Sequence, residues 1–171
     1  SDESNLISNE NTIIGNTVLY GATSGKLFAA GHAGDRFAVR NSGAITVVEG
    51  CDSNGCEYMT GGSVVILGEV GDNFAAGMTG GMAFIYDKSN DFEKKVNPES
   101  VIWQNVETTY WKNYLKKLVL EHSNETGSQI SKNLILDFEN EIKNFVQVCP
   151  KEMLDKLENP ITLKTKVKEV S

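Results

Sequence analysis

The sequence predicts a mainly β protein, a right-handed parallel β-helix whose outer face is closed by an α-helical hairpin. Three observations predict this fold. Fifteen of the sixteen glycines lie between residues 15 and 81. A repeat of 18 to 19 residues occupies the same part. Beyond residue 91 the apolar residues change to a helical spacing. A chain of 171 residues is long enough to bury a core of its own.

The glycine-rich part contains an internal repeat of four copies. The copies are residues 23–30, 41–48, 60–67 and 79–86. Their third positions are Gly25, Gly43, Gly62 and Gly81, at separations of 18, 19 and 19 residues. Glycine at a fixed place before each short apolar strand is what tight corners with positive φ require. Units repeated in this way stack into a solenoid, so we expect these glycines to be its structural corners.

Both faces of the repeated strands are apolar. Because side chains alternate along a strand, one face must point into the coil. We expect the inner columns to be Leu27, Ile45, Val64 and Ala83, and Ala29, Val47, Ile66 and Ile85. The remaining positions are also mostly apolar, which indicates that another layer covers the outside. An antiparallel β-sandwich with glycine-rich hairpins is the alternative, but it does not explain the fixed register.

The second half of the chain predicts two helices. An apolar stripe at helical spacing runs through residues 107–122, and a second runs through residues 130–145. The break at 126–128 indicates a short connection and thus an antiparallel helical hairpin. We therefore divide the chain into a polar N-terminal tail, a glycine-repeat β-helix, a helical part packed on it and a charged tail. The expected bounds are 1–11, 12–90, 91–160 and 161–171.

Composition excludes several classes of function. Sixteen basic residues stand against 23 acidic ones, a net charge of −7, which disfavours nucleic acid and anionic membrane surfaces as partners. No apolar run approaches the roughly 20 residues that cross a bilayer. The three cysteines, Cys51, Cys56 and Cys149, match no zinc pattern, so we expect reduced structural thiols.

Few residues are candidates for chemistry. His32 lies between two glycines and could act as a base, but no nucleophile, ligand set or carboxylate pair is tied to it by spacing. His122 lies near a predicted helix end, where a cation favours the helix dipole. Arg36 and Arg40 could clamp a carboxylate or phosphate, or form an internal or interdomain salt bridge. The sequence thus predicts a scaffold without catalytic, cofactor-binding or metal residues, with His32, Arg36 and Arg40 as candidate interdomain contacts.

Longer motifs add a resemblance. The run GNTVLYGATSG begins at Gly15, and further runs occupy residues 36–44, 47–50, 56–62 and 73–78. Together they resemble the C-terminal GXGXG domain of the glutamate synthase large (alpha) subunit, over roughly residues 11–155. The resemblance implies a β-helix that serves as the architectural domain of an oxidoreductase of nitrogen assimilation. Such an enzyme makes glutamate from glutamine and 2-oxoglutarate with electrons from reduced nicotinamide or ferredoxin.

The resemblance also implies partners and cofactors. FMN, the iron–sulfur cluster and the catalytic cysteine would lie on other domains, so the expected partners are the amidotransferase and FMN-binding synthase domains of the same enzyme, in the cytoplasm or a plastid. His32 stands where many members of that family have arginine, and Asn54 stands where many have histidine. The family also has glycine-rich coils upstream of Gly15, so we expect a fragment or separate subunit that could self-associate when isolated.

Two alternatives stay open at this point. Similar glycine-rich domains occur as β-helix subunits of other multisubunit redox complexes, of the formylmethanofuran dehydrogenase type. His32 and the two arginines would alternatively suit an independent small ligand-binding β-helix.

Overall fold

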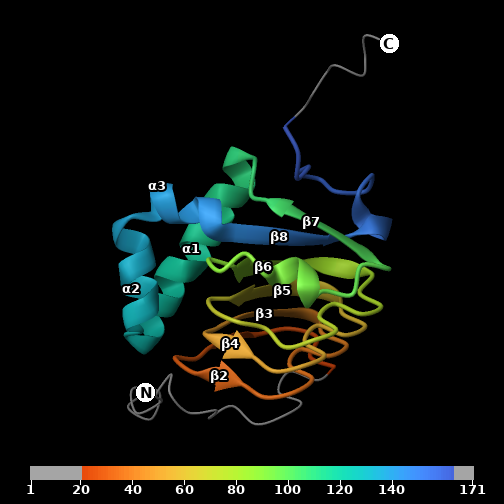
Figure 1. Ribbon diagram of the computed structural model, residues 1–171, viewed down its shortest axis with the longest axis horizontal. Coiled ribbons are helices and arrows are strands. Elements are labelled where there is room, and N and C mark those ends of the chain that lie inside the picture. Colours follow the sequence, from red (N-terminus) through yellow and green to blue (C-terminus); the bar gives the residue numbers. More distant parts are fainter. Residues whose placement is uncertain (1–20, 164–171) are drawn as a thin grey trace.

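The computed structural model describes residues 21–163, which form a β-solenoid closed by helices. Its main sheet contains four parallel strands, one from each successive coil (Figure 1). They are β1 (Lys26–Phe28), β3 (Ser42–Val48), β5 (Thr60–Ile66) and β6 (Gly80–Tyr86). A second, short parallel pair consists of β2 (His32–Ala33) and β4 (Gly50–Cys51). The predicted parallel β-helix closed by helices is confirmed, and the sandwich alternative is wrong.

The predicted inner columns are wrong at the second repeat. Val48 pairs with Ile66 and lies in the interior cluster, whereas Ile45 and Val47 contact the helices. Buried Thr46, between them, donates its hydroxyl to the Leu27 carbonyl oxygen at 2.9 Å. The cause is a register shift between β3 and β5, because Ser42 pairs with Gly61 but Ile45 pairs with Ser63. A slip of one residue exchanges the two faces of a strand.

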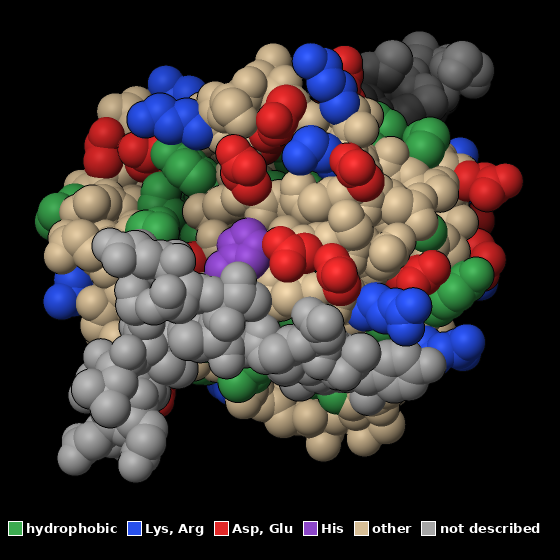
Figure 2. Space-filling model, turned by 60° about the horizontal axis from the view of Figure 1, so that its bottom comes forward, with side chains coloured by type: hydrophobic (Ala, Val, Ile, Leu, Met, Phe, Trp, Pro, Cys, Tyr) green, Lys and Arg blue, Asp and Glu red, His purple; other side chains and the backbone are tan. Residues whose placement is uncertain are grey.

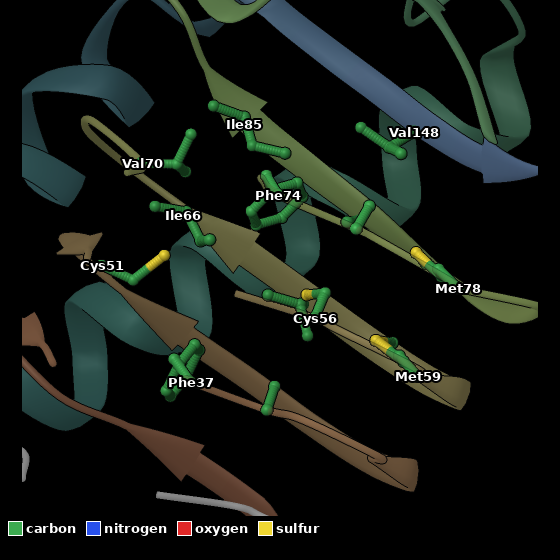
Figure 3. Close-up of a cluster of buried hydrophobic side chains, with 14 of the residues drawn as sticks. Phe37, Cys51, Cys56, Met59, Ile66, Val70, Phe74, Met78, Ile85 and Val148 are labelled. Carbon is green, nitrogen blue, oxygen red and sulfur yellow. The ribbon is translucent and has the colours of Figure 1, made fainter. Parts of the chain in front are cut away.

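The interior of the solenoid is a close-packed apolar core. Figure 3 shows large side chains from successive coils pointing toward one another between the strands and the corners. They include Phe37, Phe74, Met59, Met78, Cys56, Ile66, Ile85 and Val148. All are at most 2% exposed. The described part of the coil is therefore filled by side chains.

The four predicted glycine corners do not share one conformation. Gly25, Gly62 and Gly81 have φ values of 100°, 89° and 83°. Gly43 is not among the positive-φ residues, so the expectation is wrong there. A Cβ atom at Gly43 would lie 2.1 Å from the carbonyl oxygen of Thr23, so close approach of the neighbouring coil explains this glycine.

The outer face of the main sheet is covered by helices. They are α1 (Thr109–Thr126), α2 (Gln129–Leu136) and α3 (Phe138–Glu141). Thr108 and Ser128 cap the first two helices through side-chain oxygens, and Gly127 ends α1 at a φ of 70°. Asp137, which has φ −137°, divides the single helix predicted over residues 130–145 into α2 and α3. None of the helices within residues 21–163 is both long and apolar enough to cross a membrane.

Two strands that the sequence analysis did not predict end the solenoid. They are β7 (Val101–Asn105) and β8 (Phe145–Pro150). β8 pairs antiparallel with β6, and β7 pairs antiparallel with β8 (Figure 1). The part beyond residue 91 is therefore mixed, with 3₁₀ turns at η2 (Phe92–Lys94), η3 (Ile142–Asn144) and η4 (Lys151–Met153). The predicted N-terminal tail 1–11, the first part of the predicted β-helix (12–20) and most of the predicted charged tail (164–171) lie outside the described residues.

Candidate functional site

The corners opposite the main sheet have an unusual backbone that repeats from coil to coil. In each corner every second residue has positive φ. These residues are Arg36, Ala38 and Arg40 in one coil, Asn54, Cys56 and Tyr58 in the next, and Asn73, Ala75 and Gly77 in the third. Backbone hydrogen bonds join the corners, such as Arg40 N–H to the Glu57 oxygen at 2.9 Å and Tyr58 N–H to the Ala76 oxygen at 2.8 Å. The corners therefore stack in register.

The stack brings one arginine onto an aromatic ring. The Arg40 guanidinium carbon lies 5.4 Å from the centre of the Tyr58 ring, a cation–π arrangement. The ring in turn lies over Gly77 of the third coil, where a Cβ would be 2.5 Å from the Cδ1 atom of Tyr58. Tyr58 is nevertheless 50% exposed. Three coils thus hold the ring and the arginine together at the surface.

A second line of side chains on the same corners is a ladder of asparagines. Asn73 Nδ2 donates to Asn54 Oδ1 at 3.0 Å, and Asn97 Nδ2 donates to Asn73 Oδ1 at 2.9 Å. Arg36 holds the equivalent left-handed position in the coil before Asn54. Neither this ladder nor Tyr58 was predicted from the sequence, although extending the 18 to 19 residue repeat to the corners aligns these residues.

Both predicted arginines are exposed and lie on this corner stack. No ion pair or side-chain hydrogen bond to residues 21–163 engages either guanidinium. The internal salt bridge left open by the sequence is thus absent from the described part of the chain. Both guanidinium groups are therefore available to bind a carboxylate or phosphate group of another molecule or domain.

His32 forms an ion pair when protonated. Its Nε2 lies 2.8 Å from Asp52 Oδ1, and the two side chains are 30% and 50% exposed. Figure 2 shows the histidine of this face beside acidic side chains. The ring also packs on Gly50, where a Cβ would lie 2.4 Å from Nδ1. Across residues 21–163 no group of three histidine, cysteine or acidic side chains is arranged to hold a metal ion.

The three cysteines are buried free thiols. Burial raises the pKa of Cys51 to about 12 and that of Cys149 to about 11. Burial and the neighbouring Cys51 raise the pKa of Cys56 well above its usual value. Thiols in this state are poor nucleophiles and poor metal ligands.

His122 is part of a buried polar network that joins the helices to the coils. Its Nδ1 contacts the Ser131 hydroxyl and its Nε2 lies 2.7 Å from the Ala29 carbonyl oxygen. Nearby, the Ser128 hydroxyl donates to a carboxylate oxygen of Glu49. Burial lowers the pKa of His122, so the predicted role as a cation at the helix end is wrong.

Comparison with known proteins identifies the class. The chain belongs to the GXGXG motif family, whose model matches residues 1–151. The relatives are glutamate synthases. The chain is 61% identical over 158 residues to the glutamate synthase [NADPH] large chain of Azospirillum brasilense. The matched residues make up 92% of this chain and 10% of the relative. It is 50% identical over 161 residues to the glutamate synthase [NADH] of Schizosaccharomyces pombe, with 94% and 8% covered.

A third relative is the chloroplastic ferredoxin-dependent glutamate synthase of Spinacia oleracea, 50% identical over 139 residues, with 81% of this chain and 9% of the relative covered. The chain therefore spans about a tenth of the length of these relatives. It matches one segment of each of these glutamate synthases. The similarities do not favour the formylmethanofuran dehydrogenase type or an independent ligand-binding protein.

Proposed function

We propose that this chain is the structural and interdomain scaffold domain of a glutamate synthase, which makes glutamate from glutamine and 2-oxoglutarate with reduced nicotinamide or ferredoxin. The observation that carries the proposal is the 61% identity to a glutamate synthase large chain over nearly all of this chain and a tenth of the relative. The relatives' names include NADPH, NADH and ferredoxin types, so the electron donor is left open.

The packing supports a scaffold. The main sheet has an apolar cluster on each face, one inside the coil and one beneath the helices. A sheet buried on both faces is rigid and resists deformation, because close-packed interiors have low compressibility. Such an element can hold attached domains at a fixed separation.

The cofactors are proposed to bind elsewhere. The FMN and the iron–sulfur cluster of the whole enzyme would lie on other domains, as would the amidotransferase and synthase centres. An iron–sulfur cluster needs several thiolates, and the raised pKa values of Cys51, Cys56 and Cys149 disfavour thiolates here. These partner domains would contact the scaffold through His32, Arg36 and Arg40. The compartment would be the cytoplasm or, as in the chloroplastic relative from spinach, a plastid.

An exchange of segments tests the proposal. This chain would replace the matching segment of the Azospirillum large chain, and the chimera would be assayed for bound FMN and glutamine-dependent glutamate synthesis. We expect an assembled enzyme with a turnover per bound FMN within about threefold of the parent. A chimera that folds but fails to assemble would contradict the scaffold role.

Two variants of the chimera separate scaffolding from chemistry. Leu115→Ala, at a fully buried position beneath the helices, should lower the yield of assembled enzyme but leave turnover per bound FMN unchanged. Asp52→Asn, at the partner of His32, should change neither quantity by more than about twofold. A tenfold loss of turnover in Asp52→Asn would mean that the His32 pair takes part in the reaction.

A further inference from the structure

The two arginines occupy backbone positions that favour other residues. Arg36 has φ 60° and Arg40 has φ 58°. The equivalent positions one and two coils later carry Asn54 and Asn73, and Tyr58 and Gly77. A left-handed backbone costs a residue that carries a Cβ atom about 1–2 kcal/mol, whereas glycine, and to a lesser extent asparagine, adopts it more readily. Because Ala38, Cys56 and Tyr58 also have positive φ, this strain belongs to the corners as a whole, and the case for a role outside the fold rests on the exposure of the two arginines.

Arginine is also confined to this place. The chain has 171 residues and only these two arginines among its 16 basic residues. Both are exposed on one corner, where Tyr58 supports Arg40 from the next coil. Arginine and tyrosine are among the residues most enriched in the energetic centres of protein interfaces. An arginine that already lies on a ring is held in place before it binds, so it loses less conformational freedom on binding. Its planar guanidinium is also pre-organised for two parallel hydrogen bonds.

The neighbouring charges define the partner. Asp35 precedes Arg36, Glu57 precedes Tyr58, and Asp72 lies in the third corner. A polyanion such as nucleic acid would be repelled by these carboxylates at the same time as the arginines attract it. A protein segment with one or two carboxylates at fixed places can avoid them, and each carboxylate can accept two parallel hydrogen bonds from a guanidinium.

We infer that the surface formed by Arg36, Arg40 and Tyr58, here called the arginine corner, docks an acidic segment from another part of the glutamate synthase polypeptide. This inference rests on the proposed scaffold function and names the chemistry of the contact. The two arginines supply the charge-assisted bonds, and the Tyr58 ring supports the Arg40 guanidinium from the next coil. His32 does not belong to the arginine corner, because Asp52 already pairs with it.

Zero-length cross-linking tests the inference directly. Arg36→Lys and Arg40→Lys would be introduced into the full-length chimeric large chain, and a carbodiimide would couple the new amines to carboxylates in contact with them. Mass spectrometry should find bonds from positions 36 and 40 to Asp or Glu residues outside this segment. Lys112 and Lys116, exposed on α1, serve as internal controls for amine reactivity.

Other patterns overturn the inference. Bonds only to carboxylates of this segment would show that the arginine corner serves the domain itself, and bonds to a second copy would show self-association. Absence of bonds at positions 36 and 40 while Lys112 or Lys116 reacts with a carboxylate would show that no acidic segment is docked.

Charge reversal gives an independent measurement. In the full-length chain, Arg36→Glu with Arg40→Glu should speed limited proteolysis at the boundaries of this segment by at least about fivefold. The matched pair Lys112→Glu with Lys116→Glu should leave the rate unchanged. Equal rates for both pairs would contradict the inference. Failure of the unsubstituted chimera to assemble would instead contradict the scaffold function, so the two results are distinguishable.

Discussion

His122 and Ala29, 93 residues apart in the chain, are joined by a hydrogen bond of 2.7 Å from the imidazole Nε2 to the carbonyl oxygen. A carbonyl only accepts, so Nε2 must carry the proton, and the neutral ring accepts at Nδ1 from Ser131. One side chain therefore fixes α1 to α2 and both to the end of β1. The ring is completely buried.

Loss of this ring should destabilise the chain strongly. His122→Ala removes both hydrogen bonds, leaves the Ala29 carbonyl unpaired and opens a cavity. We expect the free energy of unfolding to fall by about 2–4 kcal/mol, measured by urea denaturation. His32→Ala, at a partly exposed ion pair, is the control and should cost less than about 1 kcal/mol. Equal losses for both variants would contradict the role of the buried bond.

Stability should depend on pH through the same ring. Burial lowers the pKa of folded His122 below 6.5, so the unfolded chain binds the proton first. The stabilisation is present above pH 6.5 and is lost as the pH falls below that value, by at most about 1.4 kcal/mol per pH unit. Denaturation curves between pH 7.5 and 5.5 measure the slope. His122→Gln should flatten it, and an unchanged slope in this variant would assign the effect to another group.

Glu49 should have the opposite dependence. Burial raises the pKa of its carboxyl above 4.5 in the folded state, and one carboxylate oxygen has no hydrogen-bond partner among residues 21–163. The folded chain therefore holds this proton more tightly, and that stabilisation is lost as the pH rises through the folded pKa. Glu49→Gln should raise the free energy of unfolding at pH 7 and have a smaller effect at pH 4. A variant that is less stable at pH 7 would show that the charge itself is needed.

Two glycines separate backbone strain from steric exclusion. Gly62 has φ 89°, and a Cβ there would lie 2.3 Å from the Ala44 carbonyl oxygen. Gly127 has φ 70°, with open space around a Cβ. Gly127→Ala should cost about 1–2 kcal/mol from conformation alone, and Gly62→Ala about 1–3 kcal/mol more from overpacking. Equal melting temperatures of the two variants would show that the coils can move apart.

The layer beneath the helices should depend on α1. Leu115 is fully buried, whereas Leu120 of the same helix is 44% exposed. Leu115→Ala should reduce the free energy of unfolding by about 2–5 kcal/mol, and Leu120→Ala by less than about 0.5 kcal/mol. Chemical denaturation of both variants provides the comparison. A small loss at Leu115 would mean that the helices contribute little to the stability of the coils.

The sequence predicted the repeat because each coil needs the same corner chemistry, and this part of the fold was confirmed. It did not predict which face of β3 points inward, because a register shift between β3 and β5 changes the offset between these strands by a single residue. β8 was missed because Phe145 continues the apolar stripe of the preceding helices, and only pairing with β6 makes it a strand.

The candidate site was predicted only in part. Arg36 and Arg40 were recognised by residue type. Their relation to Tyr58 depends on contacts between coils, which local spacing does not reveal. His122 was misassigned because a helical position alone does not show that a ring is buried.

The bonds from the helices to the coils have a consequence for insertions and deletions. His122 is tied to the end of β1 and Ser128 to Glu49 just after β3, while β8 pairs with β6 at the other end. Adjacent strands are spaced by about 4.8 Å, so loss or gain of a whole coil between β1 and β6 would displace these anchors by that distance. A coil can be lengthened at its corners, but the number of coils beneath α1 is fixed by the length of that helix.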